Sequence, residues 1–179
     1  VAPCYAEQCK KLLRKSLNYP KPIYIRIPRG EEPLVYAKDH EYDYEIGKAI
    51  VIQEGTDLNI IATGMGVYNA VQAARQLEEK GFSVGVIDMH TIKPIDKDIV
   101  LKAAKETGCI ITSEEANIIG GLGSAVAEVV SEGCPVPVVR HGVNDEFGRS
   151  GKAQAVLDAY KLNAQGIADK VRYALTLKK

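Results

Sequence analysis

The sequence predicts an α/β fold, a three-layer sandwich in which helices cover both faces of a mostly parallel, five-stranded sheet. Two observations support this prediction. From residue 48 onward, short apolar runs alternate with amphipathic stretches of helical length, which is the order expected of repeated strand and helix units. Several runs, such as "LNIIATG" and "SVGVIDM", are largely apolar without alternation, as is typical of strands buried on both faces.

The first expected elements lie before this regular part. A helix is expected over residues 6–17, and the break at "NYPKP" separates it from a short strand, "IYIRI", over residues 23–27. Residues 31–47 contain a proline, end on a glycine and show no sustained hydrophobic period. We therefore expect an extended surface linker there, whose tyrosines pack on neighbouring elements.

The regular part continues to the end of the chain. The expected strands are "AIVIQEG", "LNIIATG", "SVGVIDM", "CIITSEE" and "VPVVRHGV", and the expected helices between them cover residues 68–80, 96–107 and 122–132. Two closing helices follow the polar loop "NDEFGRSG". Asn163 is the expected N-cap of the second one, because its side-chain oxygen can accept from a free backbone amide of the first turn.

Charge divides the chain ahead of the regular part. Residues 1–29 contain seven Lys or Arg and a single acid, whereas residues 30–47 contain six acids and a single Lys. One helix and one strand cannot bury a core by themselves. We therefore predict that residues 1–30 are the tail of one domain, that residues 31–47 are a linker, and that residues 48–179 form a second domain.

Composition excludes several classes of function. The 23 basic and 23 acidic side chains cancel, which argues against nucleic acid or an anionic membrane as a partner. The four cysteines, Cys4, Cys9, Cys109 and Cys134, form no C-x-x-C pair, so neither a disulfide framework nor a zinc site is expected. No apolar run approaches the length of a membrane span, and the chain does not begin like a signal peptide. A reducing cytoplasm is the expected location.

Polar side chains gather where the expected strands end. In a parallel sheet these ends meet at one edge, where ligands usually bind. The candidates are Gly64, Gly66, Asp88, His90, Thr91, Glu114, Glu115, Arg140 and His141. Histidine and paired carboxylates could supply an acid and a base, while helix capping and solvated loop ends are the favoured alternative.

Two glycine-rich turns raise the question of phosphate binding. "ATGMGVYNA" has Asn69 where a dinucleotide fingerprint needs its third glycine, so a tight turn is the favoured interpretation, and Asp88 is a weak candidate for a ribose contact. "IIGGLGSAVAEVV" could hold an anion at a helix start. Because two glutamates lie just upstream and no Lys or Arg is near, we favour close backbone packing at Gly121 and Gly123.

Arg29 is the candidate phosphate contact. The strand expected over residues 23–27 leads into "PRG", where Pro28 restricts the backbone and Arg29 follows the strand end. A guanidinium group can bind a phosphate through two parallel hydrogen bonds. A solvated arginine is the alternative that the residues alone leave open.

Taken together and in order, "PIYIRIPRG", "GVIDMHTIKPID", "IIGGLGSAVAEVV" and "NDEFGRSGKAQAVLDAYKL" resemble the carboxyl-terminal part of the thiamine-diphosphate-dependent transketolase family. The resemblance implies that residues 1–30 are the end of a pyrimidine-binding domain and that residues 48–179 are the complete transketolase C-terminal domain. It also implies a role for Arg29, which matches the arginine that contacts the substrate phosphate in this family.

By the same resemblance, the parent enzyme binds thiamine diphosphate and magnesium at a homodimer interface and transfers two-carbon ketol units between sugar phosphates in the pentose phosphate pathway. The chain lacks the family's "GDG" metal motif, and Ala116 and Tyr5 stand where histidine and aspartate are common. We expect this section to assemble with the remaining transketolase domains, in the same or a separate chain, and to have no cofactor and no turnover of its own.

Three alternatives stay open. The parent could be a 1-deoxy-D-xylulose-5-phosphate synthase or the beta subunit of a 2-oxo acid dehydrogenase, although "GGLGSAV" and "FGRSGK" favour the transketolase and synthase side. The third alternative is a stand-alone module that binds a nucleotide or another anion with "GMG" and "GGLG". It predicts measurable affinity of the isolated chain for an anion.

Overall fold

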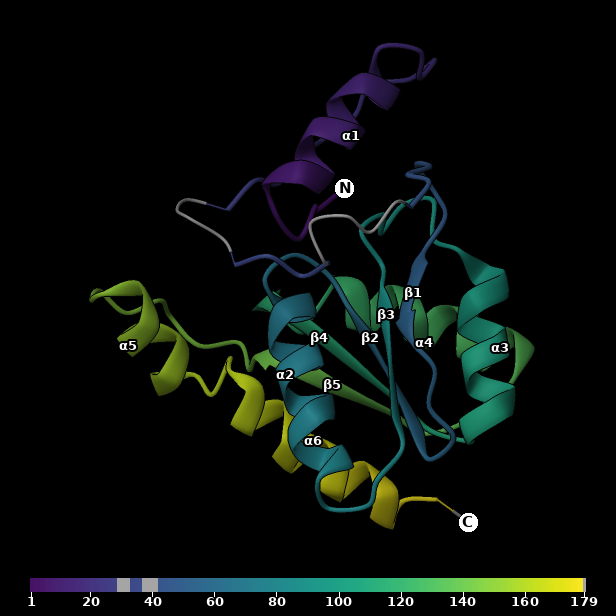
Figure 1. Ribbon diagram of the computed structural model, residues 1–179, viewed down its shortest axis with the longest axis vertical. Helices are drawn as coiled ribbons and strands as arrows, with labels where there is room; N and C mark the ends of the chain where they lie inside the picture. The colour runs from purple at the N-terminus through teal and green to yellow at the C-terminus, as the bar shows by residue number, and fades with distance from the viewer. Residues whose placement is uncertain (29–32, 37–41, 179) are drawn as a thin grey trace.

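The structure, a computed structural model, describes residues 1–28, 33–36 and 42–178. Its centre is one five-stranded sheet with the order β1-β3-β2-β4-β5 (Figure 1). The strands are β1 (Ile50–Gln53), β2 (Leu58–Ala62), β3 (Val84–Asp88), β4 (Ile110–Asn117) and β5 (Val138–Val143). Only β1 runs antiparallel to its neighbour in this sheet. The predicted mostly parallel, five-stranded sheet is therefore confirmed.

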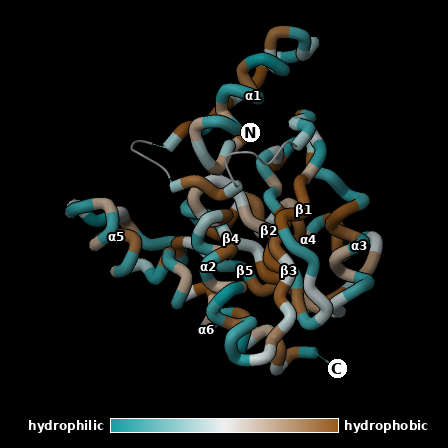
Figure 2. Tube along the Cα trace, viewed as in Figure 1, coloured by the Kyte–Doolittle hydropathy of each residue, from teal (hydrophilic) through white to brown (hydrophobic). Residues whose placement is uncertain are grey.

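Helices cover both faces of the sheet, which gives the predicted three layers. On one face lie α2 (Gly66–Glu78) and α6 (Ala164–Thr176), and on the other lie α3 (Lys97–Thr107) and α4 (Leu122–Gly133). Figure 2 shows apolar segments concentrated on the central strands, with hydrophilic segments on the surrounding helices. Helix α1 (Ala6–Ser16) lies beyond the carboxyl edge of the sheet, and α5 (Ala153–Ala159) projects to one side and has no buried residue (Figure 1).

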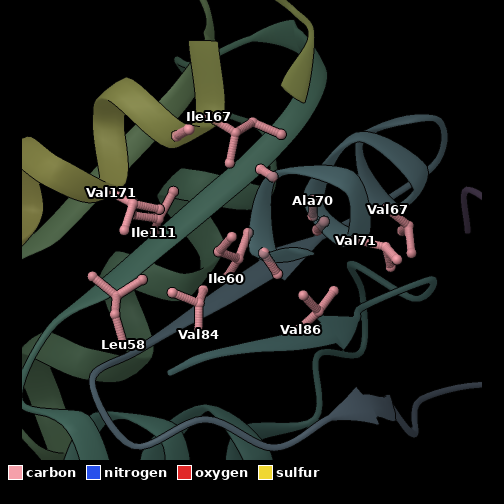
Figure 3. Packing of buried hydrophobic residues seen from close by; sticks show 14 of the residues in the cluster. Leu58, Ile60, Val67, Ala70, Val71, Val84, Val86, Ile111, Ile167 and Val171 are labelled. Atoms are coloured by element: carbon pink, nitrogen blue, oxygen red, sulfur yellow. The ribbon is translucent and has the colours of Figure 1, made fainter. Parts of the chain in front are cut away.

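The absence of alternation in the central strands has a simple cause. Ile60 on β2 packs into the cluster with Ile167 and Val171 of α6 (Figure 3), whereas Ile61 belongs to the cluster with Val126 of α4 on the other face. Because successive strand residues point to opposite faces, a strand covered on both faces is buried at every position and is mostly apolar, with Asn59 of β2 and Asp88 of β3 as buried polar exceptions. All five residues of β2 and all five of β3 are buried.

Helix boundaries follow local capping. The side chain of Asn163 accepts from Gly166 N at 2.9 Å, which confirms the predicted cap of α6. Asp96 caps α3 in the same way, and its side chain accepts from Ile99 N. Gly108 ends α3 with φ of +67°, a conformation that glycine adopts without strain.

The predicted strand over residues 23–27 is wrong. The segment is extended, and within the described part of the chain its main-chain hydrogen bonds join it only to Val1: Val1 N donates to Tyr24 O and Arg26 N donates to Val1 O, both at 2.9 Å. A single residue is too short a partner for a β-ladder. The side chains of Tyr24 and Ile27 remain 82% and 57% exposed.

The tyrosines of the 31–47 segment pack on neighbouring elements, as predicted. Tyr36 and Tyr44 are buried, and Tyr36 stacks on Tyr42 with ring centroids 4.5 Å apart. In the described parts of the chain, no helix is long and apolar enough to cross a bilayer.

Candidate functional site: the carboxyl edge of the sheet

Two consecutive carboxylates at the end of β4 determine what this edge can bind. Because neighbouring strand residues point to opposite faces, Glu114 reaches the start of α4 and Glu115 reaches the start of α2. Both helices begin at this edge, where their first backbone amides lack partners within the helix and carry partial positive charge. Each helix start therefore has an internal anion beside it.

Glu114 closes the start of α4. Its Oε2 accepts from Leu122 N and its Oε1 accepts from Gly123 N, both at 2.9 Å, and the residue is 2% exposed. A Cβ built at Gly121 would lie 2.0 Å from Glu114 Oε2, so this position needs glycine. The predicted close packing at Gly121 is confirmed, and its neighbour is the carboxylate that also binds the helix start.

The close packing predicted at Gly123 is against Arg140. A Cβ at Gly123 would lie 2.7 Å from Arg140 Cγ, so Gly123 is also a site of close packing. The guanidinium of Arg140 donates to Ile118 O at 2.9 Å. Arg140 therefore supports the turn ahead of α4.

Glu115 closes the start of α2 and also forms an ion pair with the side chain of Arg26. Its Oε2 accepts from Gly66 N at 3.2 Å, and its Oε1 accepts from the Arg26 guanidinium at 3.3 Å. Gly64 has φ of +56°, and a Cβ there would lie 2.3 Å from Glu115 Oε1. The "GMG" turn is thus a tight turn, as predicted, and Glu115 ties it to the segment that contains Arg26.

Asp88 lies at the centre of a buried polar cluster. Its Oδ2 accepts from Gln8 Nε2 at 2.5 Å, from Tyr36 OH at 2.9 Å and from Cys4 Sγ at 3.5 Å. Burial raises the pKa of Asp88 to about 6, although the three hydrogen bonds oppose the shift. Burial also raises the pKa of the Cys4 thiol, and nearby Asp88 adds to this effect. Asp88 therefore joins β3 to α1 and the linker instead of contacting a ribose.

His90 is buried beneath the linker. Its ring stacks on Tyr44 with centroids 4.2 Å apart, and its Nδ1 lies 3.0 Å from Thr91 Oγ1. Thr91 Oγ1 also accepts from Gly47 N. Burial lowers the pKa of His90 to about 4, so the imidazole is neutral at pH 7. Its role at this edge is to hold residues 44–47 against the end of β3.

His141 is satisfied on both ring nitrogens. Nε2 lies 2.9 Å from Lys161 O, which can only accept, so Nε2 carries the proton and Nδ1 accepts from Ser113 Oγ at 3.0 Å. Burial lowers the pKa of His141, and the hydrogen bond to Lys161 O opposes this shift. The imidazole joins β4 and β5 to the turn before α6.

The predicted crevice at the strand ends is filled by these internal contacts. The hollow beside Glu114, Glu115 and His141 has a volume of only about 10 Å³, room for about one water molecule. The candidate side chains that the structure describes form hydrogen bonds with neighbouring elements. No acid and base among them face each other across an open space. The hypothesis of an anion module built on "GMG" and "GGLG" is wrong for both turns.

The same contacts decide whether these residues fit a cofactor. Neither helix start fits the diphosphate of thiamine diphosphate or of a nucleotide, since a carboxylate already accepts from an amide in the first turn of each helix. In the described ranges, no group of three or more His, Cys, Asp or Glu could hold a metal ion. These residues do not form a binding site for thiamine diphosphate with magnesium.

The remaining candidates are placed as follows. Arg29 lies outside the described residues, and Pro28 is the last described position before it. Ala116 is half-buried at the end of β4. Tyr5 is buried, and its OH lies 3.1 Å from Tyr42 OH. Sequence reasoning missed the role of Gln8, whose side chain is fully buried against Asp88 and whose only local signal is a polar residue beside the apolar face of α1.

Comparisons with known proteins agree on one family. The family model described as "Transketolase, C-terminal domain" matches residues 47–167. An apulose-4-phosphate transketolase subunit of Phocaeicola vulgatus is 45% identical over 167 residues, which are 93% of this chain and 53% of that protein. The 1-deoxy-D-xylulose-5-phosphate synthase of Heliobacterium modesticaldum is 35% identical over 169 residues, 94% of this chain and 26% of the synthase.

A solved structure gives the same result in three dimensions. The chain superposes on a structure described as "Split gene transketolase, inactive beta4 tetramer" with a TM-score of 0.94 and 43% identity, over 99% of this chain and 57% of that one. The resemblance inferred from the motifs is therefore confirmed. The chain spans about half the length or less of the relatives that it matches.

Proposed function

Because the chain belongs to the transketolase C-terminal domain family, we propose that it is the C-terminal section of an enzyme that transfers two-carbon ketol units between sugar phosphates. The observation that best supports this role is the match to a subunit of a transketolase along 93% of the chain. The transferase class follows from the family, whereas the sugars and the pathway belong to the proposal.

The role proposed for this section is assembly. The helix starts at the carboxyl edge are closed by Glu114 and Glu115, so thiamine diphosphate and magnesium would be held by domains outside this chain. The partners are the remaining transketolase domains, in the same or a separate chain, and a second copy. The split-gene tetramer matched above is described as inactive, which favours a requirement for the other domains. A cytoplasmic location stays a prediction.

Arg29 is the proposed contribution of this section to substrate binding. Three residues before it, Arg26 binds Glu115, and the main chain of Arg26 binds Val1. These contacts attach the segment before Arg29 to the carboxyl edge of the sheet. A phosphate contact by Arg29 therefore depends on a segment that the C-terminal domain holds in place.

Reconstitution of the enzyme tests the proposal. Ketol transfer from a ketose phosphate to an aldose phosphate is measured, with thiamine diphosphate and Mg²⁺, for this chain alone and with a section that supplies the missing domains. We expect no turnover by the chain alone and turnover by the mixture. Turnover by the chain alone, or micromolar binding of thiamine diphosphate to it in calorimetry, would contradict the assembly role.

A second candidate is supported by the match to a 1-deoxy-D-xylulose-5-phosphate synthase. The identity is lower, at 35% against 45%, so the transketolase reaction is preferred. The same reconstituted mixture distinguishes the two candidates. Formation of 1-deoxy-D-xylulose 5-phosphate in place of ketol transfer between sugars would favour the synthase.

A further inference from the structure

Polar contacts, more than packing, hold residues 23–28 at the carboxyl edge of the sheet. In this described segment no residue is buried, and the large apolar side chains of Tyr24 and Ile27 are exposed. Its side-chain polar contact with the described part of the chain is the ion pair between Arg26 and Glu115, with the N and O atoms 3.3 Å apart. The position of the segment therefore depends on a small number of hydrogen bonds and this pair.

Main-chain hydrogen bonds provide one attachment of the segment. Arg26 N donates to Val1 O at 2.9 Å. The next residue, Ala2, donates from its N to His90 O at 2.8 Å and accepts from Gly64 N at 3.2 Å. These two acceptor and donor positions follow β3 and β2. The segment thus stays attached to the edge without its ion pair, so we expect a variant that breaks the pair to fold.

Glu115 provides the second attachment and joins the segment to a helix. Its Oε1 binds the Arg26 guanidinium, while its Oε2 accepts from N of Gly66, the first residue of α2, at 3.2 Å. Because one carboxylate binds both groups, the helix start fixes the position of the carboxylate, and the carboxylate fixes that of the guanidinium. The two side chains are 22% and 34% exposed, so water screens this pair less than a pair on the open surface.

We propose that Glu115 is a positioning residue for substrate binding, which acts through Arg26 on the phosphate contact at Arg29. Arg29 follows Arg26 by three residues, and three residues of chain span at most about 10 Å. Pro28 lies between them and restricts the backbone further. This inference rests on the phosphate contact proposed above and adds the residue of the C-terminal domain that sets it. Binding of a sugar without a phosphate should not depend on Glu115.

A purely electrostatic role of Glu115 predicts a different result. Its negative charge would repel a phosphate bound nearby, so removing that charge alone would strengthen phosphate binding, and removing the positive charge of Arg26 alone would weaken it. If Glu115 positions the segment, the loss of either partner has the same consequence, because each loss breaks the same pair. The sign of the effect of Glu115 therefore distinguishes the two roles.

Steady-state kinetics of the reconstituted enzyme test the proposal. KM is measured for a ketose phosphate and for the same ketose without its phosphate, in Glu115→Gln, Arg26→Met and the double variant. Glutamine keeps an oxygen that can accept from Gly66 N but loses the charge that binds Arg26. We expect each variant to raise KM for the ketose phosphate about two- to fivefold, the range that a partly exposed ion pair can supply. No comparable rise is expected for the free ketose.

Non-additivity tests the route of the effect. The double variant should match the single variants, since the pair can be lost only once. In an Arg29→Ala background, Glu115→Gln should have no further effect on KM for the ketose phosphate. The proposal is overturned by equal rises for both ketoses, by a fall in KM with Glu115→Gln, or by additive effects in either combination.

Glu54→Gln is the control, matched in the length of the ion pair that it breaks. Glu54 pairs with Lys102 at the same distance of 3.3 Å. It lies near Ser83, which precedes β3, and therefore at the opposite edge of the sheet. The substitution removes one acid and one ion pair and should leave both KM values as in the wild type. A rise as large as that of Glu115→Gln would contradict a local effect.

Two outcomes separate this inference from the proposed function. If the wild-type mixture transfers no ketol unit, the proposed function is rejected and the positioning role with it. If the mixture is active but KM for the ketose phosphate is unchanged in the variants, only the positioning role is rejected. Arg26→Met leaves the hydrogen bond between Glu115 and Gly66 N in place, so it provides the same test if Glu115→Gln fails to fold.

Discussion

Replacing Glu114 by alanine removes the acceptor for two amides at the start of α4. Both hydrogen bonds are 2.9 Å long, and the residue is 2% exposed, so water could replace the carboxylate only by entering a cavity. A hydrogen bond to a charged group contributes about 1.5–3 kcal/mol, and a helix cap as a whole contributes up to about 2 kcal/mol. We expect Glu114→Ala to lower the free energy of unfolding by about 3 kcal/mol or more.

Urea unfolding followed by circular dichroism measures this change. With a slope of about 2 kcal/mol per M urea, the expected loss moves the midpoint down by about 1.5 M. Glu115→Ala is the matched control, because Glu115 performs the same role at α2 with longer contacts of 3.2 and 3.3 Å and a side chain that is 22% exposed. A partly exposed pair contributes about 1 kcal/mol or less, so this control should shift the midpoint by about 0.5 M.

Glu114→Gln separates shape from charge. The amide keeps the size of the side chain and one acceptor, but its NH₂ group then faces a backbone N–H, and two donors cannot bond to each other. We expect the free energy of unfolding of Glu114→Gln to lie between those of the wild type and of Glu114→Ala. The reasoning is refuted if Glu114→Ala destabilises the chain no more than Glu115→Ala does, or if Glu114→Gln unfolds like the wild type.

Three further predictions concern a buried carboxyl group, a closely packed glycine and the candidate phosphate contact. Folding raises the pKa of Asp88 from 3.8 to about 6, so the folded chain binds this proton more tightly than the unfolded chain does. The free energy of unfolding therefore falls as pH rises from about 4 to 6. In urea titrations at several pH values, Asp88→Asn should remove that fall. A Cβ at Gly121 would lie 2.0 Å from Glu114 Oε2, whereas nothing lies within 4 Å at Gly148, whose φ is not positive, so Gly121→Ala should lower the thermal midpoint more than Gly148→Ala. In the reconstituted enzyme, Arg29→Ala should raise KM for phosphorylated sugars about ten- to a hundredfold, and equal effects on unphosphorylated analogues would contradict the phosphate contact.

The fold was predictable because both faces of the central strands are covered. A strand such as β2, with Ile60 and Ile61 facing different helices, needs apolar residues at successive positions, and this leaves a pattern that can be recognised without any tertiary information. The cap at Asn163 was also predictable, because its side chain bonds to an amide only three residues away and the pattern is therefore local. The strand over residues 23–27 was not predictable. A strand needs a partner, and apolar composition alone did not reveal that, among the described residues, the main chain of this segment bonds only to Val1.

The candidate site was predictable in location but not in chemistry. The residues at the strand ends do lie at one edge, yet Glu114 and Glu115 act in opposite directions, because adjacent strand residues face opposite layers. Partners such as Gln8 and Tyr36 lie far from Asp88 in sequence. No local pattern connects such residues, since their contact depends on how α1 and the linker cover the end of β3.

The sequence by itself determined the layered fold, the tight turn at Gly64, the close packing at Gly121 and, through four ordered motifs, the family. All of these depend on local periodicity, backbone conformation or the spacing of nearby residues. Only the tertiary structure decided that both helix starts are already closed by carboxylates and that His90 and His141 are buried and neutral. Such properties arise when distant segments compete for the same amides and the same space, and a linear pattern contains no measure of that competition.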